Sequence, residues 1–254
     1  MPRSNGIAAS VARTDTPHSL LSGLGLHGLL PLEPVILAAL AIEEPLLLIG
    51  PHGTGKSLLL LRIAGALGLE LRHYNASLLN FDDLVGFPLP GKDGSLEYVK
   101  TPASIWGAGA VIFDEISRCR PDIQNKLFPI VHERRTQGIL LDGLRYRWAA
   151  MNPPLSDDDN EGYLGSEPLD PALADRFAFI AEIPSWENLS EDDQLRIIVA
   201  GDENGGSAAS SALRRAIETT RASIPILRES MGDAVAVYVR TLVALLAQAS
   251  ICLS

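Results

Sequence analysis

The chain has few cysteines and no excess of basic residues, and both shortages exclude classes of protein. Its 254 residues contain two cysteines, Cys119 and Cys252, and neither lies near another cysteine or a histidine at the spacing of a metal site. We therefore interpret them as reduced thiols of a cytoplasmic protein. Lysine and arginine total 21 against 31 aspartates and glutamates, a net charge of −10. Such a chain lacks the positive field of a constitutive nucleic-acid binder.

The sequence also lacks a secretion signal and internal repeats. Residues 1–20 have no apolar core of the kind that directs secretion, and we interpret them as a flexible leader. The most apolar stretch, 234–254, is long enough to span a bilayer. Arg240 near its middle would cost roughly 2.5–3.5 kcal/mol there, and no basic cluster flanks the stretch. We therefore favour a packed helix of a small bundle, without membrane insertion.

Short apolar runs alternate with helical patterns as far as Pro184. Strands are predicted at 46–49, 71–75, 110–113, 147–151 and 177–183, and helices at 32–44, 57–67 and 121–135. Strands that alternate with helices predict a parallel sheet covered on both faces. After Pro184 the pattern is only helical. We expect a three-layer α/β core over 21–184 and a small all-helical lid over 185–254.

Two turn-rich segments interrupt this alternation. The sequence Pro-Gly-Lys-Asp-Gly-Ser at 90–95 separates two extended segments, and Asp142-Gly143 lies between alternating residues, a strong signal for a hairpin. Both segments predict hairpins inserted between elements of the sheet, around 87–98 and 138–148. An acidic run at 156–162 superficially resembles a calcium loop but lacks the ligand spacing of one. We interpret it as a solvated loop.

The segment GPHGTGKS at 50–57 follows the first predicted strand and precedes a helix. It fits the pattern G-x-x-x-x-G-K-[ST], in which backbone N–H groups and a helix N-terminus hold nucleotide phosphates. Lys56 would reach the β- and γ-phosphates, and Ser57 would bind Mg²⁺. His52 occupies a variable position, where we expect no catalytic role. The predicted ATP-binding residues are Gly50, Pro51, His52, Gly53, Thr54, Gly55, Lys56, Ser57 and Leu58.

Further polar groups follow two other buried strands. Asp114 and Glu115 come directly after the apolar run 110–113. Asp114 would hold Mg²⁺ in its outer shell and Glu115 would orient the attacking water, because phosphoryl transfer depends on positioning. An acidic pair that caps the next helix is the alternative. Asn152 follows the strand at 147–151 and would contact the γ-phosphate. Its alternative is an Asx turn before two prolines.

Together these pieces resemble the AAA+ ATPases, and within them the MoxR group of helix-2-insert proteins. GPHGTGKS matches Walker A, VIFDEISR at 111–118 matches Walker B, and AAMNPP at 149–154 matches sensor 1. The resemblance covers about residues 24–184. It implies a five-stranded sheet with helices on both faces, a helical lid, and ATP bound between neighbouring subunits of a ring, which we expect to be a hexamer.

The resemblance also assigns roles to single residues and to the hairpins. Arg176, in Asp-Arg-Phe before the last strand, falls where the family places its arginine finger, which stabilises transition-state charge in the neighbouring subunit. Asn75 would hold Glu115 inactive until a partner binds; a turn residue at a strand end is the alternative. The hairpins match the family's helix-2 and pre-sensor insertions, which project toward the pore or partner face. Ordinary surface hairpins are the alternative.

We therefore expect a Mg²⁺-dependent ATPase of the MoxR type that remodels or activates a protein partner, which in that family often carries a von Willebrand factor A domain. The alternatives are a DNA-directed motor and a nucleotide-gated scaffold with little turnover. The expected hairpin tips are neutral at 91–94 and acidic at Asp142-Gly143, which disfavours a motor that tracks DNA. Lys56, Glu115 and Arg176 speak against the scaffold.

The end of the chain carries a separate expectation. AAA+ lids commonly supply a sensor 2 arginine, but no basic residue follows Arg240, and Arg228 and Arg240 are poor substitutes. We expect an incomplete lid that lacks sensor 2. The apolar face of the helix at 235–246 would then be exposed and would make the chain prone to association.

Overall fold

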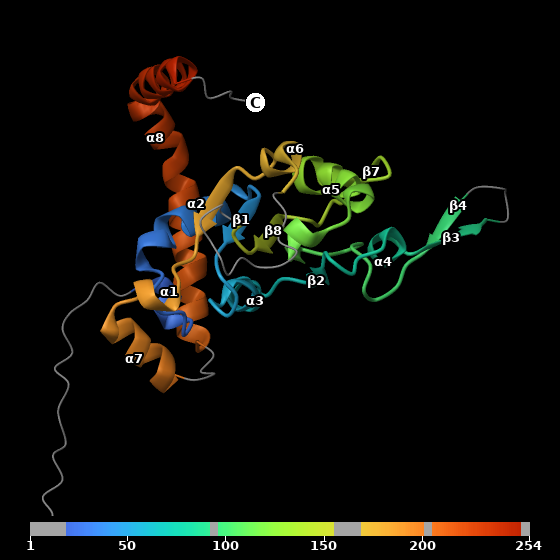
Figure 1. The fold of residues 1–254 in the computed structure, drawn as a ribbon, viewed down its shortest axis with the longest axis horizontal. Helices are drawn as coiled ribbons and strands as arrows, with labels where there is room; N and C mark the ends of the chain where they lie inside the picture. The colour runs from blue at the N-terminus through green and yellow to red at the C-terminus, as the bar shows by residue number, and fades with distance from the viewer. Residues whose placement is uncertain (1–18, 92–95, 155–168, 201–204, 250–254) are drawn as a thin grey trace, which may run out of the picture.

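The computed structural model describes residues 19–91, 96–154, 169–200 and 205–249. At its centre lies a five-stranded sheet in the order β2-β5-β8-β1-β9 (Figure 1). The strands are β1 (Leu46–Ile49), β2 (Leu71–Asn75), β5 (Ala110–Asp114), β8 (Tyr146–Met151) and β9 (Phe179–Glu182). All neighbouring strands pair in parallel. The predicted α/β class is confirmed, and the acidic run at 156–162 lies outside the described residues.

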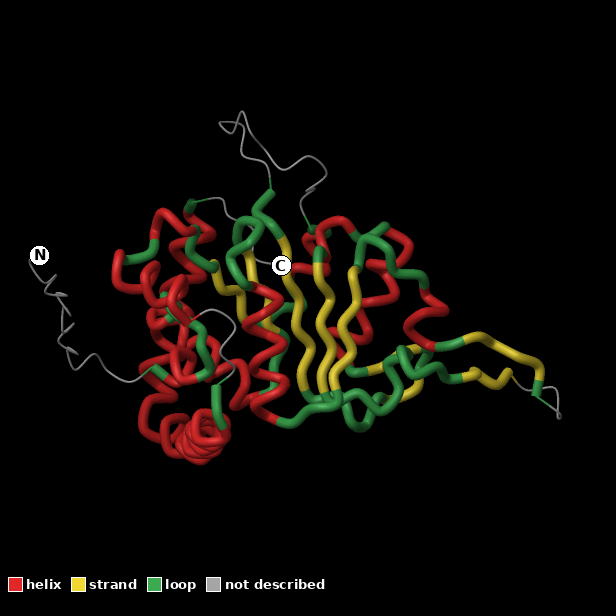
Figure 2. The backbone as a smooth tube through the Cα atoms, turned by 90° about the horizontal axis from the view of Figure 1, so that it is seen from below, coloured by secondary structure: helices red, strands yellow, loops and turns green. Residues whose placement is uncertain are grey.

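Side chains of the central strands enter two apolar cores, because successive residues of a strand point to opposite faces. On β1, Leu46 and Leu48 belong to one core and Leu47 to the other. A parallel sheet buried on both faces requires continuous apolar runs rather than alternation. The runs at 46–49 and 110–113 meet this requirement. Helices cover both faces of the sheet and form the outer layers of a three-layer fold (Figure 2).

The helices on the face of Leu46 and Leu48 come from both ends of the chain. They are α1 (Leu20–Gly23), α2 (Glu33–Ile42) with the preceding 3₁₀ turn η1 (Leu30–Leu32), α3 (Lys56–Leu67) and α8 (Ser207–Gln248). Glu43 ends α2 in the left-handed conformation, with φ of 59°. Pro45 follows closely and cannot continue a helix. This is why α2 stops shortly before β1.

The opposite face is covered by helices from the middle of the chain. They are α4 (Phe81–Val85), α5 (Pro121–Glu133), which follows the 3₁₀ turn η2 (Ile116–Arg118), and α6 (Pro171–Ala174). Proline at the start of α5 fits the first turn of a helix, where no N–H partner is required. The helix buries Ile123, Leu127 and Ile130 against the sheet. It ends at Arg134, which is also left-handed.

The first predicted hairpin is present. Strands β3 (Phe87–Pro90) and β4 (Leu96–Val99) pair antiparallel, and both views show them projecting from the body of the molecule (Figures 1 and 2). Phe87 and Leu89 are exposed on this projection. Residues 92–95, where we expected the neutral tip, lie outside the described residues.

A second hairpin is present, but it lies at 135–140 instead of the predicted 138–148, and its predicted turn is wrong. Its strands are β6 (Arg135–Thr136) and β7 (Ile139–Leu140), joined by Gln137 and Gly138. Both of these residues have positive φ, 51° and 76°, as a two-residue turn between twisted strands requires. Asp142-Gly143 instead lies in a separate turn that leads into β8. The exposed tip is therefore neutral and has Arg135 beside it, not an acidic pair.

The described secondary-structure elements after β9 are all helical. They are the 3₁₀ turn η3 (Trp186–Asn188), α7 (Glu191–Ala200) and the 42-residue α8. The first half of α8 packs on the core through Leu213, Ile217 and Ile224. Beyond Pro225 the helix projects from the body (Figure 1).

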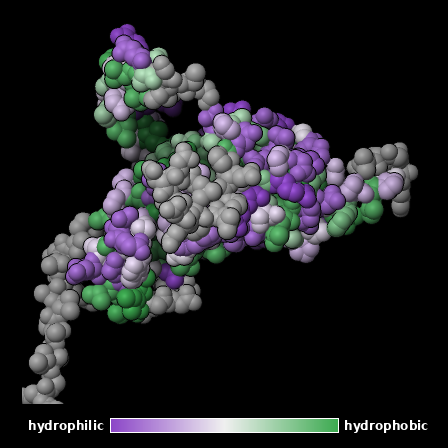
Figure 3. All heavy atoms as spheres, in the orientation of Figure 1, coloured by the Kyte–Doolittle hydropathy of each residue, from purple (hydrophilic) through white to green (hydrophobic). Residues whose placement is uncertain are grey.

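The projecting half of α8 exposes large apolar side chains (Figure 3). Val237 is 60% exposed and Tyr238 is 67% exposed. The expectation of an exposed apolar face is met, whereas the expected packing of this helix within a bundle is not seen in the described residues. By length and composition α8 is the one described helix that could cross a membrane. Core helices of soluble proteins share this property, so it assigns no location.

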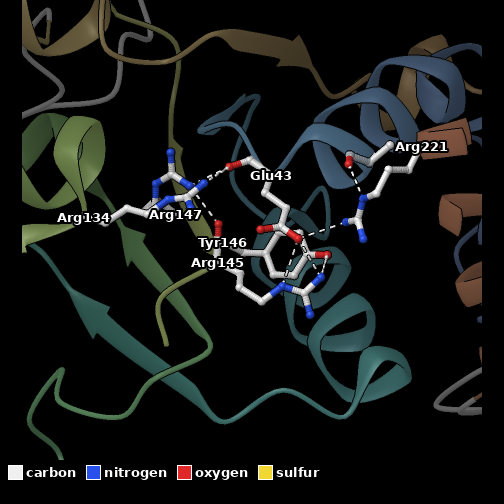
Figure 4. Close-up of polar contacts among 7 residues, drawn as sticks. Glu43, Arg134, Arg145, Tyr146, Arg147 and Arg221 are labelled. Carbon is white, nitrogen blue, oxygen red and sulfur yellow. Dashed lines mark hydrogen bonds and ion pairs between the residues drawn. The ribbon is translucent and has the colours of Figure 1, made fainter. Parts of the chain in front are cut away.

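A cluster of arginines around Glu43 connects α8 to the sheet (Figure 4). One Glu43 carboxylate oxygen accepts hydrogen bonds from Arg145, at 2.6 Å and 2.9 Å, and from Arg221 of α8, at 2.9 Å. The backbone oxygen of Glu43 accepts from Arg134 and Arg147. Burial opposes ionisation of Glu43, but the hydrogen bond and charge of Arg145 and the charges of Arg221 and Arg134 prevail and lower its pKa.

Arg147 is the most buried member of this cluster, with 2% of its surface exposed. Besides Glu43, its guanidinium donates to the backbone oxygens of Val131 and Arg145. Burial lowers the pKa of Arg147 to about 10, so it remains charged at neutral pH. The cluster thereby joins the end of α2, the end of α5, the start of β8 and the middle of α8.

Candidate nucleotide-binding site

Polar residues meet at one edge of the sheet because β1, β5 and β8 are parallel neighbours. Their C-terminal ends lead into the glycine loop, Asp114-Glu115 and Asn152, and ligands of open α/β sheets bind at this edge. A cavity of about 220 Å³ lies there. It is lined by His52, Gly53, Gly55, Lys56, Ser57, Leu58, Asp114, Glu115, Met151 and Asn152. The predicted residues Gly50, Pro51, Thr54, Asn75 and Arg176 are not among its described lining.

The glycine loop adopts a backbone conformation that requires glycine. Gly53 and Gly55 have φ of 75° and 80°, and each faces open space where a Cβ atom would project. Gly50 is restricted by packing, since a Cβ atom there would lie 3.0 Å from the backbone oxygen of Ile183. The Thr54 hydroxyl donates to the oxygen of Pro51 at 2.9 Å and closes the loop. The loop thus forms an open cradle suited to phosphate groups.

Lys56 is the first residue of α3 and is only 8% exposed. Its ammonium group donates to the backbone oxygens of Gly50 and Pro51, both at 2.7 Å, and to Asn152 Oδ1 at 3.2 Å. Burial lowers the pKa of Lys56, and the carboxylates of Asp114 and Glu115 counteract this shift only in part. Lys56 therefore places a positive charge at the cradle.

Ser57 and Asp114 form the candidate magnesium site. Ser57 Oγ donates to Asp114 Oδ2 at 2.6 Å, so two oxygen atoms of the type that Mg²⁺ prefers lie side by side. No cluster of three or more His, Cys, Asp or Glu side chains suited to a metal occurs in the described ranges. Mg²⁺ takes few protein ligands and completes its coordination with phosphates and water.

His73 was not predicted as a site residue, but it contacts the carboxylate of Asp114. Its Nε2 atom lies 3.4 Å from Asp114 Oδ2. Burial opposes ionisation of Asp114, but hydrogen bonds from His73, from Ser57 and from the Glu115 N–H prevail and lower its pKa. The contact depends on β2 pairing with β5. Strand order is absent from the linear sequence, and the only local signal was a histidine near the end of a predicted strand.

Glu115, the residue after β5, has a backbone conformation that is uncommon for residues other than glycine. Its φ is 53°, in the left-handed region, and such residues concentrate at functional sites. Glu115 precedes the turn η2 but makes no side-chain cap hydrogen bond, so its geometry does not favour the alternative role of a helix cap. Its carboxylate lines the cavity and lies 3.9 Å from Arg118.

Asn152 is 4% exposed and lies between two residues of the glycine loop. Its Oδ1 accepts from Lys56, and its Nδ2 lies 3.0 Å from His52 Nε2. The residue predicted to act as sensor 1 thus contacts two residues of the predicted Walker A segment. Sequence motifs placed these residues in one site, but the contact with His52 was not expected.

Two predicted residues lie apart from the cavity. Asn75 Oδ1 accepts from the N–H and hydroxyl groups of Ser77 at 3.0 Å and 2.6 Å, as in a turn at a strand end. Its proposed contact with Glu115 stays a prediction. Arg176 follows α6 and is exposed. An exposed position leaves it available to another subunit, and its role also stays a prediction.

Comparison with known proteins identifies the family. The chain matches the family described as "AAA domain (dynein-related subfamily)" over residues 45–177, more than half of its length. A solved structure described as a "putative ATPase" from Cytophaga hutchinsonii ATCC 33406 is similar, with a TM-score of 0.53 and 19% identity over 77% of this chain. The chain spans 60% of the length of that protein, and the likeness shows a shared fold. No curated protein matches the chain. The chain therefore belongs to the dynein-related subfamily of AAA domains and has the AAA+ P-loop fold.

Proposed function

We propose that this chain is a Mg²⁺-dependent ATP hydrolase of the MoxR type that acts as a ring, expected to be a hexamer, and remodels or activates a protein partner. One observation carries the proposal of hydrolysis. Lys56, Ser57, Asp114, Glu115 and Asn152 line a single cavity at the ends of three adjacent strands. This combination provides a phosphate cradle, a metal site and a carboxylate for water in one place.

Each residue has a distinct task in the proposed reaction. The N–H groups of the glycine loop and Lys56 hold the phosphates, and Ser57 and Asp114 hold Mg²⁺, which would neutralise charge on the phosphate oxygens. Glu115 orients the attacking water, and Asn152 contacts the γ-phosphate. Arg176 of a neighbouring subunit stabilises the charge of the transition state.

The proposal of a protein partner rests on charge and on the projecting hairpin. The net charge of −10 opposes general binding to nucleic acid, and the β3–β4 hairpin exposes Phe87 and Leu89, apolar groups typical of protein contacts. The resemblance to MoxR proteins adds a von Willebrand factor A domain as a candidate partner. The two cysteines, interpreted as reduced thiols, support a cytoplasmic location. Membrane insertion is not part of the proposal.

A DNA-directed motor is the second candidate, and the corrected hairpin turn is the observation that favours it. The tip at Gln137-Gly138 carries no acidic residue, and the neighbouring Arg135 is exposed. A strand-tracking tip is usually basic or aromatic, so one arginine is modest support. If DNA raises the ATPase rate several-fold in a salt-sensitive way, and Arg135→Ala abolishes this effect, the second candidate replaces the first.

The first test measures ATP hydrolysis with and without Mg²⁺ in the parent chain, Lys56→Ala and Glu115→Gln. Hydrolysis should require Mg²⁺ and be lost in both variants, since one removes a phosphate contact and the other the group that orients water. The exposed Glu133, changed to Gln, provides a control that should keep the parental rate. Near-parental turnover in Glu115→Gln would overturn the assignment. Because that variant should retain ATP, it should also retain the protein partner for identification by mass spectrometry.

A further inference from the structure

The contacts of Asn152 define which end of its amide faces Lys56 and which end faces His52. An ammonium group only donates hydrogen bonds, so the Asn152 atom that lies 3.2 Å from Lys56 Nζ must be the oxygen. The amide nitrogen then faces His52 Nε2 at 3.0 Å. Because an amide nitrogen donates, His52 Nε2 must accept. The contact therefore assigns the acceptor role to His52 Nε2.

We propose that His52 is a positioning residue that keeps the amide nitrogen of Asn152 available for the γ-phosphate. The inference rests on the proposed ATP hydrolysis. An amide reversed about its last torsion would present its oxygen to the phosphate oxygens, and two acceptors repel each other. The side chain of Asn152 alone does not determine which of its ends faces which neighbour.

The restraint that His52 places on Asn152 becomes more important when Lys56 binds the phosphates of a nucleotide. The Lys56 ammonium holds Asn152 Oδ1 and two backbone oxygens of the loop, and the same ammonium is the group proposed to bind the β- and γ-phosphates. A lysine shared with phosphates holds the amide oxygen less firmly. The contact with His52 is a restraint on the amide that does not involve the lysine. It requires one hydrogen of the amide nitrogen, which carries two.

The position of His52 allows its role to be tested without disturbing the core. His52 is exposed in the glycine loop, whereas Asn152 is buried. Glutamine carries an acceptor at a distance from the backbone similar to that of histidine Nε2. Leucine fills a similar volume without an acceptor. Comparison of His52→Gln with His52→Leu therefore separates the effect of the hydrogen bond from the effect of side-chain volume.

Steady-state ATP hydrolysis of the parent, His52→Leu and His52→Gln tests this inference. His52→Leu should lower kcat roughly tenfold, because a misplaced catalytic group costs rate rather than binding. The KM for ATP and the affinity for ADP should change less than about twofold, since the cradle is intact. His52→Gln should restore most of kcat. In an Asn152→Ala background, His52→Leu should have no further effect.

Each other outcome decides against the inference. Equal losses of kcat in His52→Leu and His52→Gln would show that the acceptor is unimportant. The same loss in the Asn152→Ala background would show that His52 acts independently of Asn152, and a rise in KM for ATP and weaker ADP binding would make it a direct phosphate ligand. If the parent chain hydrolyses ATP and the His52 variants keep the parental rate, the inference about His52 is wrong and the proposed function still stands. A parent chain without hydrolysis would remove the proposed function and this inference with it.

Discussion

At the scale of single residues, the proposed magnesium site can be tested through Ser57 and Asp114. Ser57 Oγ lies 2.6 Å from Asp114 Oδ2, and loss of one oxygen ligand should weaken Mg²⁺ binding more than ATP binding. We expect Ser57→Ala to raise the Mg²⁺ concentration for half-maximal ATP hydrolysis by roughly tenfold, an effect of the size seen when partners of a metal site are removed. A magnesium titration at saturating ATP measures this.

The control for this titration is Ser230→Ala, since Ser230 is exposed on α8. It should leave the magnesium dependence unchanged. An unchanged dependence in Ser57→Ala would place the metal elsewhere. A lower maximal rate with the parental magnesium midpoint would make Ser57 a group that orients the loop.

The residues of the site could be predicted from the sequence where they belong to one continuous motif. The segment 50–57 encodes its own loop, because its glycines permit positive φ and its lysine and serine begin the following helix. The contacts of His73 with Asp114 and of His52 with Asn152 join segments 41 and 100 residues apart. Such contacts depend on strand order and side-chain rotamers, which no local pattern contains.

At the scale of elements, the cluster around Glu43 predicts how stability depends on pH. The carboxylate accepts from Arg145 and Arg221 and joins β8 to α8. Glu43→Gln keeps the shape but removes the charge, so we expect the free energy of unfolding at pH 7 to fall by about 2 kcal/mol, the scale of hydrogen bonds to charged groups. The folded-state pKa of Glu43 lies below its ordinary value of 4.5. Its contribution is therefore complete above pH 4.5 and is lost as the pH falls through the folded-state pKa.

Urea denaturation of the parent and Glu43→Gln at pH 7 and at successively lower pH values measures this difference. The gap between the two proteins should be constant near neutrality and should narrow as acid protonates the parent carboxylate. Glu133→Gln, at an exposed position, should follow the parent throughout. A gap that is independent of pH would mean that Gln disturbs packing rather than charge.

Helices, strands and turns could be predicted where a single local sequence signal is strong. The predictions failed where the structure does not follow the strongest local signal. The strand at 46–49 is continuously apolar and bounded by Pro45 and Gly50, and its bounds match the structure. Asp142-Gly143 was the only turn signal considered for the second hairpin, but the turn lies at Gln137-Gly138, where Gln137 adopts a left-handed conformation. The continuous course of α8 through Pro225 is likewise not indicated by propensity, since proline normally ends a helix.

At the scale of the whole molecule, Arg176, which lies between α6 and β9, is not among the residues that line the cavity of its own chain. The cavity lies at the ends of β1, β5 and β8, whereas Arg176 is exposed just before the edge strand β9. In a head-to-tail ring, an exposed group on one side of a subunit faces the site of the next subunit. Such an arrangement would make hydrolysis depend on assembly, so the rate per subunit should rise with protein concentration.

Mixing two inactive variants tests this dependence on a neighbour. Arg176→Ala chains keep an intact cradle, and Lys56→Ala chains keep an intact arginine, so each alone should hydrolyse little ATP. In an equal mixture about a quarter of head-to-tail interfaces would pair an intact cradle with an intact neighbouring arginine. Hydrolysis should recover to a similar fraction of the parental rate, provided that neighbouring sites act independently. A mixture of Lys56→Ala with Glu115→Gln should stay inactive, because both defects lie in the cradle subunit. If rings proved by mass spectrometry to contain both Arg176→Ala and Lys56→Ala chains stayed equally inactive, Arg176 would have to act within its own chain.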